Sequence, residues 1–299
     1  FGFDFLNLLA DTTSLKNNIV SGNIKFVYYP SDSWKISSVT ARGFHSPNVD
    51  DMFKVFRKGN NLTVPFKELR PEYSLSQELS ITKELNHDIT LYGVGFYTQL
   101  TDAIIKDTLW YDINPEPNEE HFMSEMPYDG DIVTLFANQN SNSRVHIYGF
   151  TFGLNAKVFG LQINQDLNIT RAINEDRSQG PFAHIPPIFG KLEILKKLEH
   201  WTFRFSCLYS GAKLAEDFDH AGVDNIDETP ILIIPESGEE LWVGSPAWYT
   251  LNFSTKYKFN NGLSIQLSAE NILDAHYKTF GSGISAAGRS IIVSAKYGF

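Results

Sequence analysis

The last ten residues carry the feature that most restricts how this chain can fold. Between residues 290 and 299 every second position is apolar, and the set is Ile291, Val293, Ala295, Tyr297 and Phe299. The intervening positions are polar or small, with Ile292 as the exception. A two-residue period gives a β-strand one apolar and one polar face. About ten residues tilted by roughly 40° cross an apolar band of about 25 Å, the height of a transmembrane β-barrel wall.

The two preceding segments repeat this alternation. Residues 249–259 are mostly apolar on one parity, whereas the other parity holds Thr250, Asn252, Ser254, Lys256 and Lys258. Asn260-Asn261-Gly262 follows, and it suits a tight hairpin because Asn and Gly tolerate positive φ. Residues 263–270 then alternate again. One such strand could belong to a soluble sandwich, but recurrence with aromatic residues at the strand ends favours a membrane barrel.

About eleven segments of the chain qualify as strands by this criterion. They cover residues 18–29, 34–46, 73–85, 89–105, 132–158, 161–174, 189–198, 201–210, 247–259, 262–273 and 290–299. Short connections alternate with long ones, and the long ones cover residues 47–72, 106–131, 175–188, 211–246 and 274–289. Short turns at one rim and long loops at the other are typical of bacterial outer-membrane barrels, with the short turns in the periplasm. We therefore predict an all-β, antiparallel transmembrane β-barrel.

The order of turns and loops predicts strand directions. The first strand ends at a short turn and the last one follows a long loop, so both run from the outside to the periplasm. An odd number of antiparallel strands cannot close into a barrel, and open edges in lipid cost several kcal/mol per unpaired backbone group. We expect the remaining strands to come from the same or another chain. One further strand would instead allow a small closed barrel of about twelve strands.

Composition narrows the class of protein. No run of about 18 apolar residues exists, so a helical membrane span is not expected. The net charge of −10 argues against a nucleic-acid partner. Cys207 is the single cysteine, so no internal disulfide can form, and its parity with Phe203, Phe205 and Tyr209 predicts a lipid-facing position. No basic start or small-residue cleavage site follows Phe1, so no signal peptide is expected there.

Several motifs resemble one family of barrels. Near the end, Asn271-Ile-Leu-Asp274 is followed by Tyr277, Ala286-Ala-Gly-Arg289 and the terminal Phe299. Upstream stand, in order, Gly43-Phe-His-Ser-Pro-Asn48, Leu69-Arg-Pro-Glu72, Arg144-Val-His-Ile-Tyr-Gly149 and Ile185-Pro-Pro-Ile-Phe-Gly190. This series is similar to the barrel of TonB-dependent outer-membrane receptors, and it covers nearly the whole chain from about residue 18.

The resemblance implies a barrel of about twenty-two strands filled by an amino-terminal plug domain. Residues 18–299 would be the carboxyl-terminal part of that barrel, residues 1–17 part of an extracellular loop, and the plug absent from this chain. The implied function is TonB-driven import of a scarce nutrient such as a siderophore–iron complex, haem, cobalamin or a glycan. The implied partners are TonB, through the missing plug segment, the imported small molecule or metal chelate, and outer-membrane lipid and lipopolysaccharide. A passive porin or a structural barrel in a larger complex is the alternative.

Polar residues on the lumen parity are the best candidates for contacts with a plug or ligand. They are Asn164, Asp166, Arg204, Asn252, Lys256, Gln266 and Glu270. Which residues bind the substrate cannot be chosen from the sequence, because loops set specificity.

Two long loops are acidic. Asp217, Asp219, Asp224 and Asp227 could supply oxygen ligands to calcium, although their spacing departs from the EF-hand and a solvated acidic loop is the simpler interpretation. His121, with Met123 and Met126 nearby, could hold haem or a soft metal, but a mobile surface loop is again simpler. We expect no metal, no cofactor and no catalytic residues, because no nucleophile–base arrangement is evident.

Overall fold

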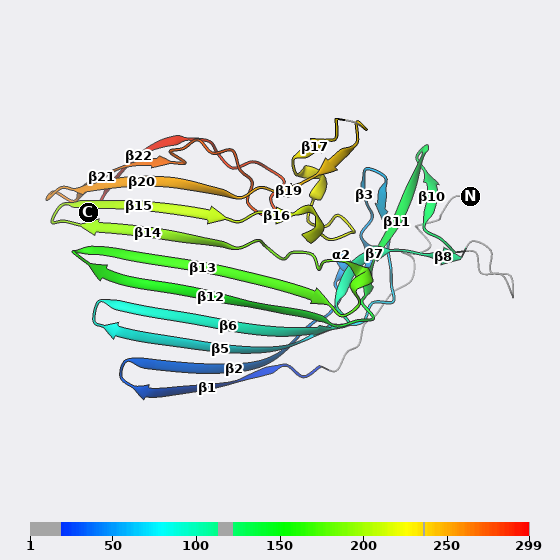
Figure 1. The fold of residues 1–299 in the computed structure, drawn as a ribbon, viewed down its shortest axis with the longest axis horizontal. Helices are drawn as coiled ribbons and strands as arrows, with labels where there is room; N and C mark the ends of the chain where they lie inside the picture. The colour runs from blue at the N-terminus through cyan, green and yellow to red at the C-terminus, as the bar shows by residue number, and fades with distance from the viewer. Residues whose placement is uncertain (1–18, 113–121, 236, 299) are drawn as a thin grey trace.

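An eleven-stranded antiparallel sheet dominates the structure, a computed structural model that describes residues 19–112, 122–235 and 237–298 (Figure 1). Neighbouring strands in the sheet also follow one another along the chain. The strands are β1 (Gly22–Ser31), β2 (Trp34–His45), β5 (Glu72–Asn86), β6 (Ile89–Thr101), β12 (Val145–Val158), β13 (Leu161–Asn174), β14 (Phe189–Lys197), β15 (Trp201–Ser210), β20 (Trp248–Lys258), β21 (Leu263–Glu270) and β22 (Ser290–Tyr297).

The register sorts the side chains as the two-residue period predicts. Ala269 of β21 lies opposite Phe253 of β20 and Ile291 of β22, and the next outward row joins Leu267 to Val293. Gln266, on the other parity, lies opposite Lys256 and Ser294. One face of the sheet is therefore rich in aliphatic and aromatic groups and the other in polar ones, which is the pattern of a barrel wall between lipid and an aqueous interior.

Short turns and long connections lie at opposite ends of the sheet (Figure 1). The tight connections include residues 32–33, 87–88 and 159–160. Because every neighbouring pair is antiparallel, β1 and β22 run in the same direction at the two ends of the sheet. The predictions of loop sorting and of parallel end strands are both confirmed. No helix in the described ranges is long and apolar enough to cross a membrane.

One predicted strand is wrong. The segment 132–158 is divided into β11 (Asp131–Asn140) and β12, and only β12 joins the large sheet. Ser141 ends the first part, because its hydroxyl bonds the backbone carbonyl of Ser143 and the side chain of Gln179. The predicted strand 89–105 likewise ends earlier, since Asp102 adopts a left-handed conformation with φ of 54°.

The long connections contain small elements of their own. A five-stranded sheet consists of β3 (Phe56–Lys58), β4 (Asn61–Thr63), β7 (Ile104–Thr108), β10 (Glu125–Tyr128) and β11. Further pairs are β8 (Tyr111–Asp112) with β9 (Phe122–Met123), β16 (Lys213–Leu214) with β19 (Gly244–Ser245), and β17 (Ile231–Ile233) with β18 (Glu240–Trp242). The helices are short: α2 (Val49–Phe53), η1 (Arg177–Gln179), η2 (Ala215–Asp217) and η3 (Ile226–Glu228). The predicted loop segment 1–17 lies outside the described residues.

Candidate functional site

The long connections contact one another at the end of the sheet opposite the short turns (Figure 1). Lys58 of β3 donates from Nζ to Asn225 Oδ1 at 2.8 Å and to Asp227 Oδ1 at 2.7 Å, across 167 and 169 residues of sequence. Lys106 of β7 reaches the same connection, with Nζ 3.2 Å from the Ala221 carbonyl oxygen. Loops that leave distant strands are therefore joined into one cap over this end of the sheet.

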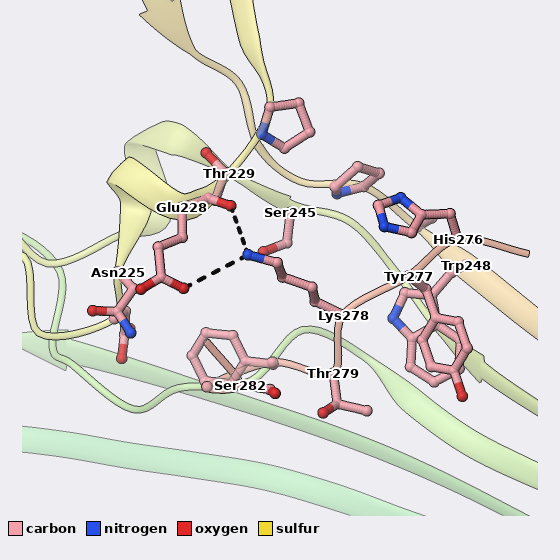
Figure 2. A pocket seen from close by; sticks show the side chains of 16 residues that line it. Asn225, Glu228, Thr229, Ser245, Trp248, His276, Tyr277, Lys278, Thr279 and Ser282 are labelled. Carbon is pink, nitrogen blue, oxygen red and sulfur yellow. Dashed lines mark hydrogen bonds and ion pairs between the residues drawn. The ribbon is translucent and has the colours of Figure 1, made fainter. Parts of the chain in front are cut away.

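A pocket of about 310 Å³ opens between the connections 211–247 and 271–289. Figure 2 shows Trp248 and Tyr277 together on one side and Lys278 reaching across to Glu228 on the other. The two aromatic ring centroids are 4.1 Å apart, with a tilt of 31°. Hydroxyl groups complete the lining, from Thr229, Ser245, Thr279 and Ser282. Aromatic faces beside a few polar groups are characteristic of small-molecule binding sites.

The charges in this pocket are of both signs. Lys278 Nζ lies 3.2 Å from the Glu228 carbonyl oxygen and 3.6 Å from its carboxylate oxygen Oε2. Both side chains remain about one-third exposed, at 36% and 35%. An ion pair of this kind contributes little to stability, so little free energy is lost if a ligand takes the place of one partner. The pocket can therefore offer a cation, a carboxylate and an aromatic surface to one ligand.

A buried ion pair holds the wall of the pocket. Lys213 Nζ lies 2.7 Å from Asp224 Oδ2, and the two side chains are 4% and 1% exposed. Lys213 also donates to the Ile185 carbonyl oxygen at 3.0 Å and lies 4.4 Å from the Phe280 ring centroid. Asp224 and Phe280 both line the pocket. The pair thus connects residues 185, 211–225 and 280 at a single buried point.

The interpretation of residues 211–246 as a solvated acidic loop is wrong for two of its carboxylates. Asp219 and Asp224 are buried, and Asp219 accepts backbone N–H groups from Val223 and Asp224, each at 2.8 Å. Asp227 pairs with Lys58 instead of approaching Asp224 as a calcium ligand would. Over the described ranges, no cluster of three or more His, Cys, Asp or Glu side chains could hold a metal ion.

The second acidic loop is more ordered in the structure than its composition suggests. Residues 104–108 and 125–128 form β7 and β10, and both strands pair with β11. Met126 is buried in an apolar cluster with Leu62, Val133 and Leu135. Its thioether therefore packs in a core, and the interpretation as a mobile loop is wrong for these strands. His121, the other candidate for a haem or soft-metal ligand, lies outside the described residues.

A second cavity of about 270 Å³ adjoins the cap and is lined by Lys106, Asn174, His184 and His220 among others. Burial lowers the pKa of Lys106, and the nearby Lys58 and Lys54 lower it further, while Asp219 opposes them. The ammonium of Lys106 is therefore held at some cost, and its contacts include the neutral carbonyl oxygen of Ala221 and the Phe136 ring, whose centroid lies 4.8 Å away. We assign no ligand to this cavity.

The comparison with known families decides the class of the protein. The family described as "TonB dependent receptor-like, beta-barrel" matches residues 1–272, which is most of the chain. The chain belongs to this family. TonB-dependent receptors are outer-membrane proteins of Gram-negative bacteria, and the predicted resemblance and fold class are confirmed.

Solved structures of such receptors have the same fold. The copper transporter OprC gives a TM-score of 0.67 at 11% identity over 93% of this chain and 39% of OprC. The siderophore receptor PirA from Acinetobacter baumannii gives 0.63 at 14% identity, over 93% and 41%. The ferripyoverdine receptor of the outer membrane of Pseudomonas aeruginosa gives 0.58 at 12% identity, over 93% and 32%. No curated protein sequence matches significantly. The chain thus spans about two fifths or less of these receptors.

The register of this TonB-dependent receptor barrel places all seven predicted lumen residues on its polar face. Four of them, Arg204, Asn252, Gln266 and Glu270, surround one hollow of about 420 Å³. Beside it, Glu193 Oε2 lies 3.0 Å from Lys191 Nζ and 3.7 Å from Arg204 Nε. Asp166 accepts a hydrogen bond from the Tyr92 hydroxyl across Gly153, where any side chain would collide with the tyrosine ring. Binding by these residues stays a prediction.

The family motif Asn271-Ile-Leu-Asp274 ties the two ends of a receptor loop together. Asn271 is buried, and its amide nitrogen donates to the carbonyl oxygens of Ala275 at 2.9 Å and Ala287 at 3.1 Å. Its Oδ1 accepts the Ala275 N–H at 2.9 Å. Asp274 Oδ1 accepts the Arg289 N–H at 2.7 Å. These four bonds fix residues 271–289 and hence the position of Tyr277 and Lys278.

We expect Asn271→Ala to lower the free energy of unfolding by about 1–3 kcal/mol, because two carbonyls and one N–H lose their partner. The left-handed backbone at Asn271, with φ of 47°, adds to the effect because Ala tolerates it less well. The temperature at which the full-length receptor loses its folded band on a gel measures the change. Asn142→Ala, at an exposed position, is the matched control. Equal melting of the two variants would contradict the role of Asn271.

No pattern in the sequence marks the aromatic pocket as a site. Trp248 stands at a strand start, where an aromatic girdle residue is expected, and Tyr277 belongs to the family motif. The two rings meet because β20 begins where the loop 271–289 folds back toward it, and no local pattern specifies this contact. The useful signal was an aromatic residue next to a lysine in a loop already rich in glycine and serine.

Proposed function

We propose that the chain is the carboxyl-terminal barrel portion of a TonB-dependent transporter that imports a scarce nutrient, such as a metal chelate, across the outer membrane. The observation that carries the proposal is the pocket between Trp248, Tyr277, Lys278 and Glu228 in the cap of a barrel of this family. On the orientation typical of such barrels, the cap faces the exterior and the short turns face the periplasm. A nutrient arriving from outside would meet this pocket first.

The chemistry of the pocket favours a chelate that carries planar or hydroxylated groups. Stacking on an aromatic ring can hold a planar group, while Lys278 can hold a carboxylate or phenolate oxygen. In this proposal, a plug segment and the remaining strands complete the transporter, TonB supplies energy through the plug, and lipid and lipopolysaccharide surround the wall. The protein carries out transport and no covalent chemistry.

Uptake by cells that produce the full-length receptor tests the proposal. Radioactive iron is supplied as ferric catecholate, hydroxamate and citrate chelates to a strain that lacks its own iron receptors. We expect accumulation of at least one chelate, and we expect a protonophore or deletion of TonB to abolish it. Accumulation that persists with the protonophore would instead support the alternative of a passive porin. No accumulation beyond that of the empty strain would favour a structural barrel or another nutrient class.

Trp248→Ala is expected to weaken binding of the imported chelate by about tenfold, because the stacking surface and its Tyr277 partner are lost. Quenching of the intrinsic fluorescence of the full-length receptor by the chelate measures the dissociation constant. Trp242→Ala is the matched control, since Trp242 is an exposed tryptophan of β18, in the connection that precedes Trp248, and lies outside the pocket. Equal affinities of the two variants would place the binding site elsewhere.

A further inference from the structure

A groove of about 370 Å³ interrupts the outward, apolar face of the sheet. It lies across β5, β6 and β12 and is lined by Leu79, Ile81, Lys83, Leu91, Phe150 and Phe152, together with Gly93 and Gly95. The register places these side chains on the same face as the lipid-facing rows of the wall. The groove is therefore open to the bilayer, and its floor and sides are hydrocarbon.

Two glycines of β6 form the floor of the groove. Phe150 lies opposite Gly95 in the register, but its ring leans over Gly93, where an added Cβ would be 3.1 Å from Phe150 Cζ. An added Cβ at Gly95 would have no atom within 4 Å. The space above Gly95 is therefore empty of protein atoms. An empty apolar space costs contact energy unless something fills it.

A single cation stands at one end of the groove. Lys83 faces outward on β5, four positions nearer the short turns than Leu79, or about 14 Å along the strand. Its Nζ lies 2.7 Å from Ser33 Oγ and 4.6 Å from the Trp34 ring centroid. None of the ion pairs found among the described residues involves Lys83. A lysine has three N–H groups, so two can still bind an anion.

We propose that this groove binds one phospholipid of the periplasmic leaflet, with an acyl chain over Gly95 and the phosphate at Lys83. The leaflet rests on the orientation used for the proposed function, in which the short turns face the periplasm. The order of the groups carries the proposal: an apolar groove lies toward the middle of the wall, and at its edge a cation stands beside a tryptophan, with no carboxylate partner among the described residues. A phospholipid has the same order, and Trp and Lys are favoured at the level of its head group.

A protein partner fits this surface less well. A second barrel or a membrane helix would cover the ammonium of Lys83 with apolar side chains, and burying a cation without a counter-charge costs free energy. Lipopolysaccharide carries phosphates too, but on the proposed orientation they lie at the opposite end of the wall, far from Lys83.

Native mass spectrometry of the full-length receptor in mild detergent, with phosphatidylethanolamine and lipopolysaccharide added, tests the proposal. We expect one retained phospholipid, its loss in Gly95→Leu and weaker retention in Lys83→Gln. An added Cβ at Gly95 has no protein atom within 4 Å, and the backbone φ there is ordinary, so we expect the variant to fold. Cys207→Leu adds bulk to the same lipid-facing side on β15 and should keep the lipid.

Unchanged retention in Gly95→Leu, retention of lipopolysaccharide in place of phospholipid, or a second receptor copy on the groove would each overturn the proposal. Lipid retention is measured without an imported nutrient, so this test is independent of the uptake experiment. If uptake fails while the lipid behaves as expected, the proposed function fails and the lipid site stands. If Gly95→Leu keeps the lipid while chelate uptake is normal, only the lipid site fails.

Discussion

Lys213→Met is expected to lower the opening free energy of the receptor cap by about 3–5 kcal/mol, because it leaves the carboxylate of Asp224 buried without its counter-charge. The backbone N–H of His184, 2.9 Å from Asp224 Oδ1, is neutral, and the His184 imidazole, with Nδ1 3.3 Å from the same oxygen, carries a charge only when it is protonated. Hydrogen exchange of the backbone amides in 182–185 and 211–225 measures the change. We expect their exchange to accelerate by two orders of magnitude or more, while the amides of β13 and β15 keep their protection.

Two further variants separate the buried ion pair from ordinary surface charge. Lys278→Met breaks the pair with Glu228, in which both side chains are about one-third exposed. It should change the opening free energy measured by the same amides by less than about 1 kcal/mol. The double variant Lys213→Met with Asp224→Leu removes both charges and should recover much of the loss, since apolar groups of similar size can replace a buried pair. If Lys213→Met and Lys278→Met accelerate exchange to a similar extent, the buried ion pair of Lys213 and Asp224 does not hold the cap in place.

The second large effect is expected in the wall of the barrel. Leu267→Arg places a charge on the outward face in the middle of β21, where Leu267 lies between Thr255 and Val293. A cation at the bilayer midplane costs about 2–4 kcal/mol, so the urea midpoint for unfolding of the full-length receptor in lipid vesicles should fall accordingly. Intrinsic fluorescence follows the transition.

Gln266→Arg is the matched control for Leu267→Arg. It introduces the same side chain one residue earlier on the same strand, but on the polar face opposite Lys256 and Ser294. We expect a shift of only a few tenths of a kcal/mol, from repulsion with Lys256 in a hydrated interior. If the two arginines destabilise equally, the assignment of the outward and inward faces is wrong.

The strands of the wall were predictable because the pattern that specifies each strand lies within that strand's own sequence. A strand with one face in lipid must alternate at every second residue, and residues 248–270 and 290–297 do so almost without interruption. The error at 132–158 has the same origin. β11 and β12 are both rich in β-branched and aromatic residues, which favour strands, and only the bonds of Ser141 to Ser143 and Gln179 show that the chain turns between them.

The cap was not predictable because it depends on contacts between residues that are far apart in the sequence. Asp219, Asp224 and Asp227 look alike in the sequence, yet Asp224 pairs with a lysine on β16, Asp227 with a lysine on β3, and Asp219 with backbone N–H groups. Burial of a carboxylate depends on which cation the fold brings to it, and composition alone favours a solvated loop. The Trp248–Tyr277 pocket depends on the same kind of contact.

The contact of Lys58 with Asn225 and Asp227 has a consequence for the order of assembly. Each strand of the wall pairs with its neighbours in the chain, so hairpins can form one after another as the sequence is laid down. The ammonium of Lys58 meets partners 167 and 169 residues away, and it can do so only once the intervening strands have brought both loops to one rim. Energy transfer between two dyes, one on each of these loops, would therefore report the time at which the last stage of insertion is reached.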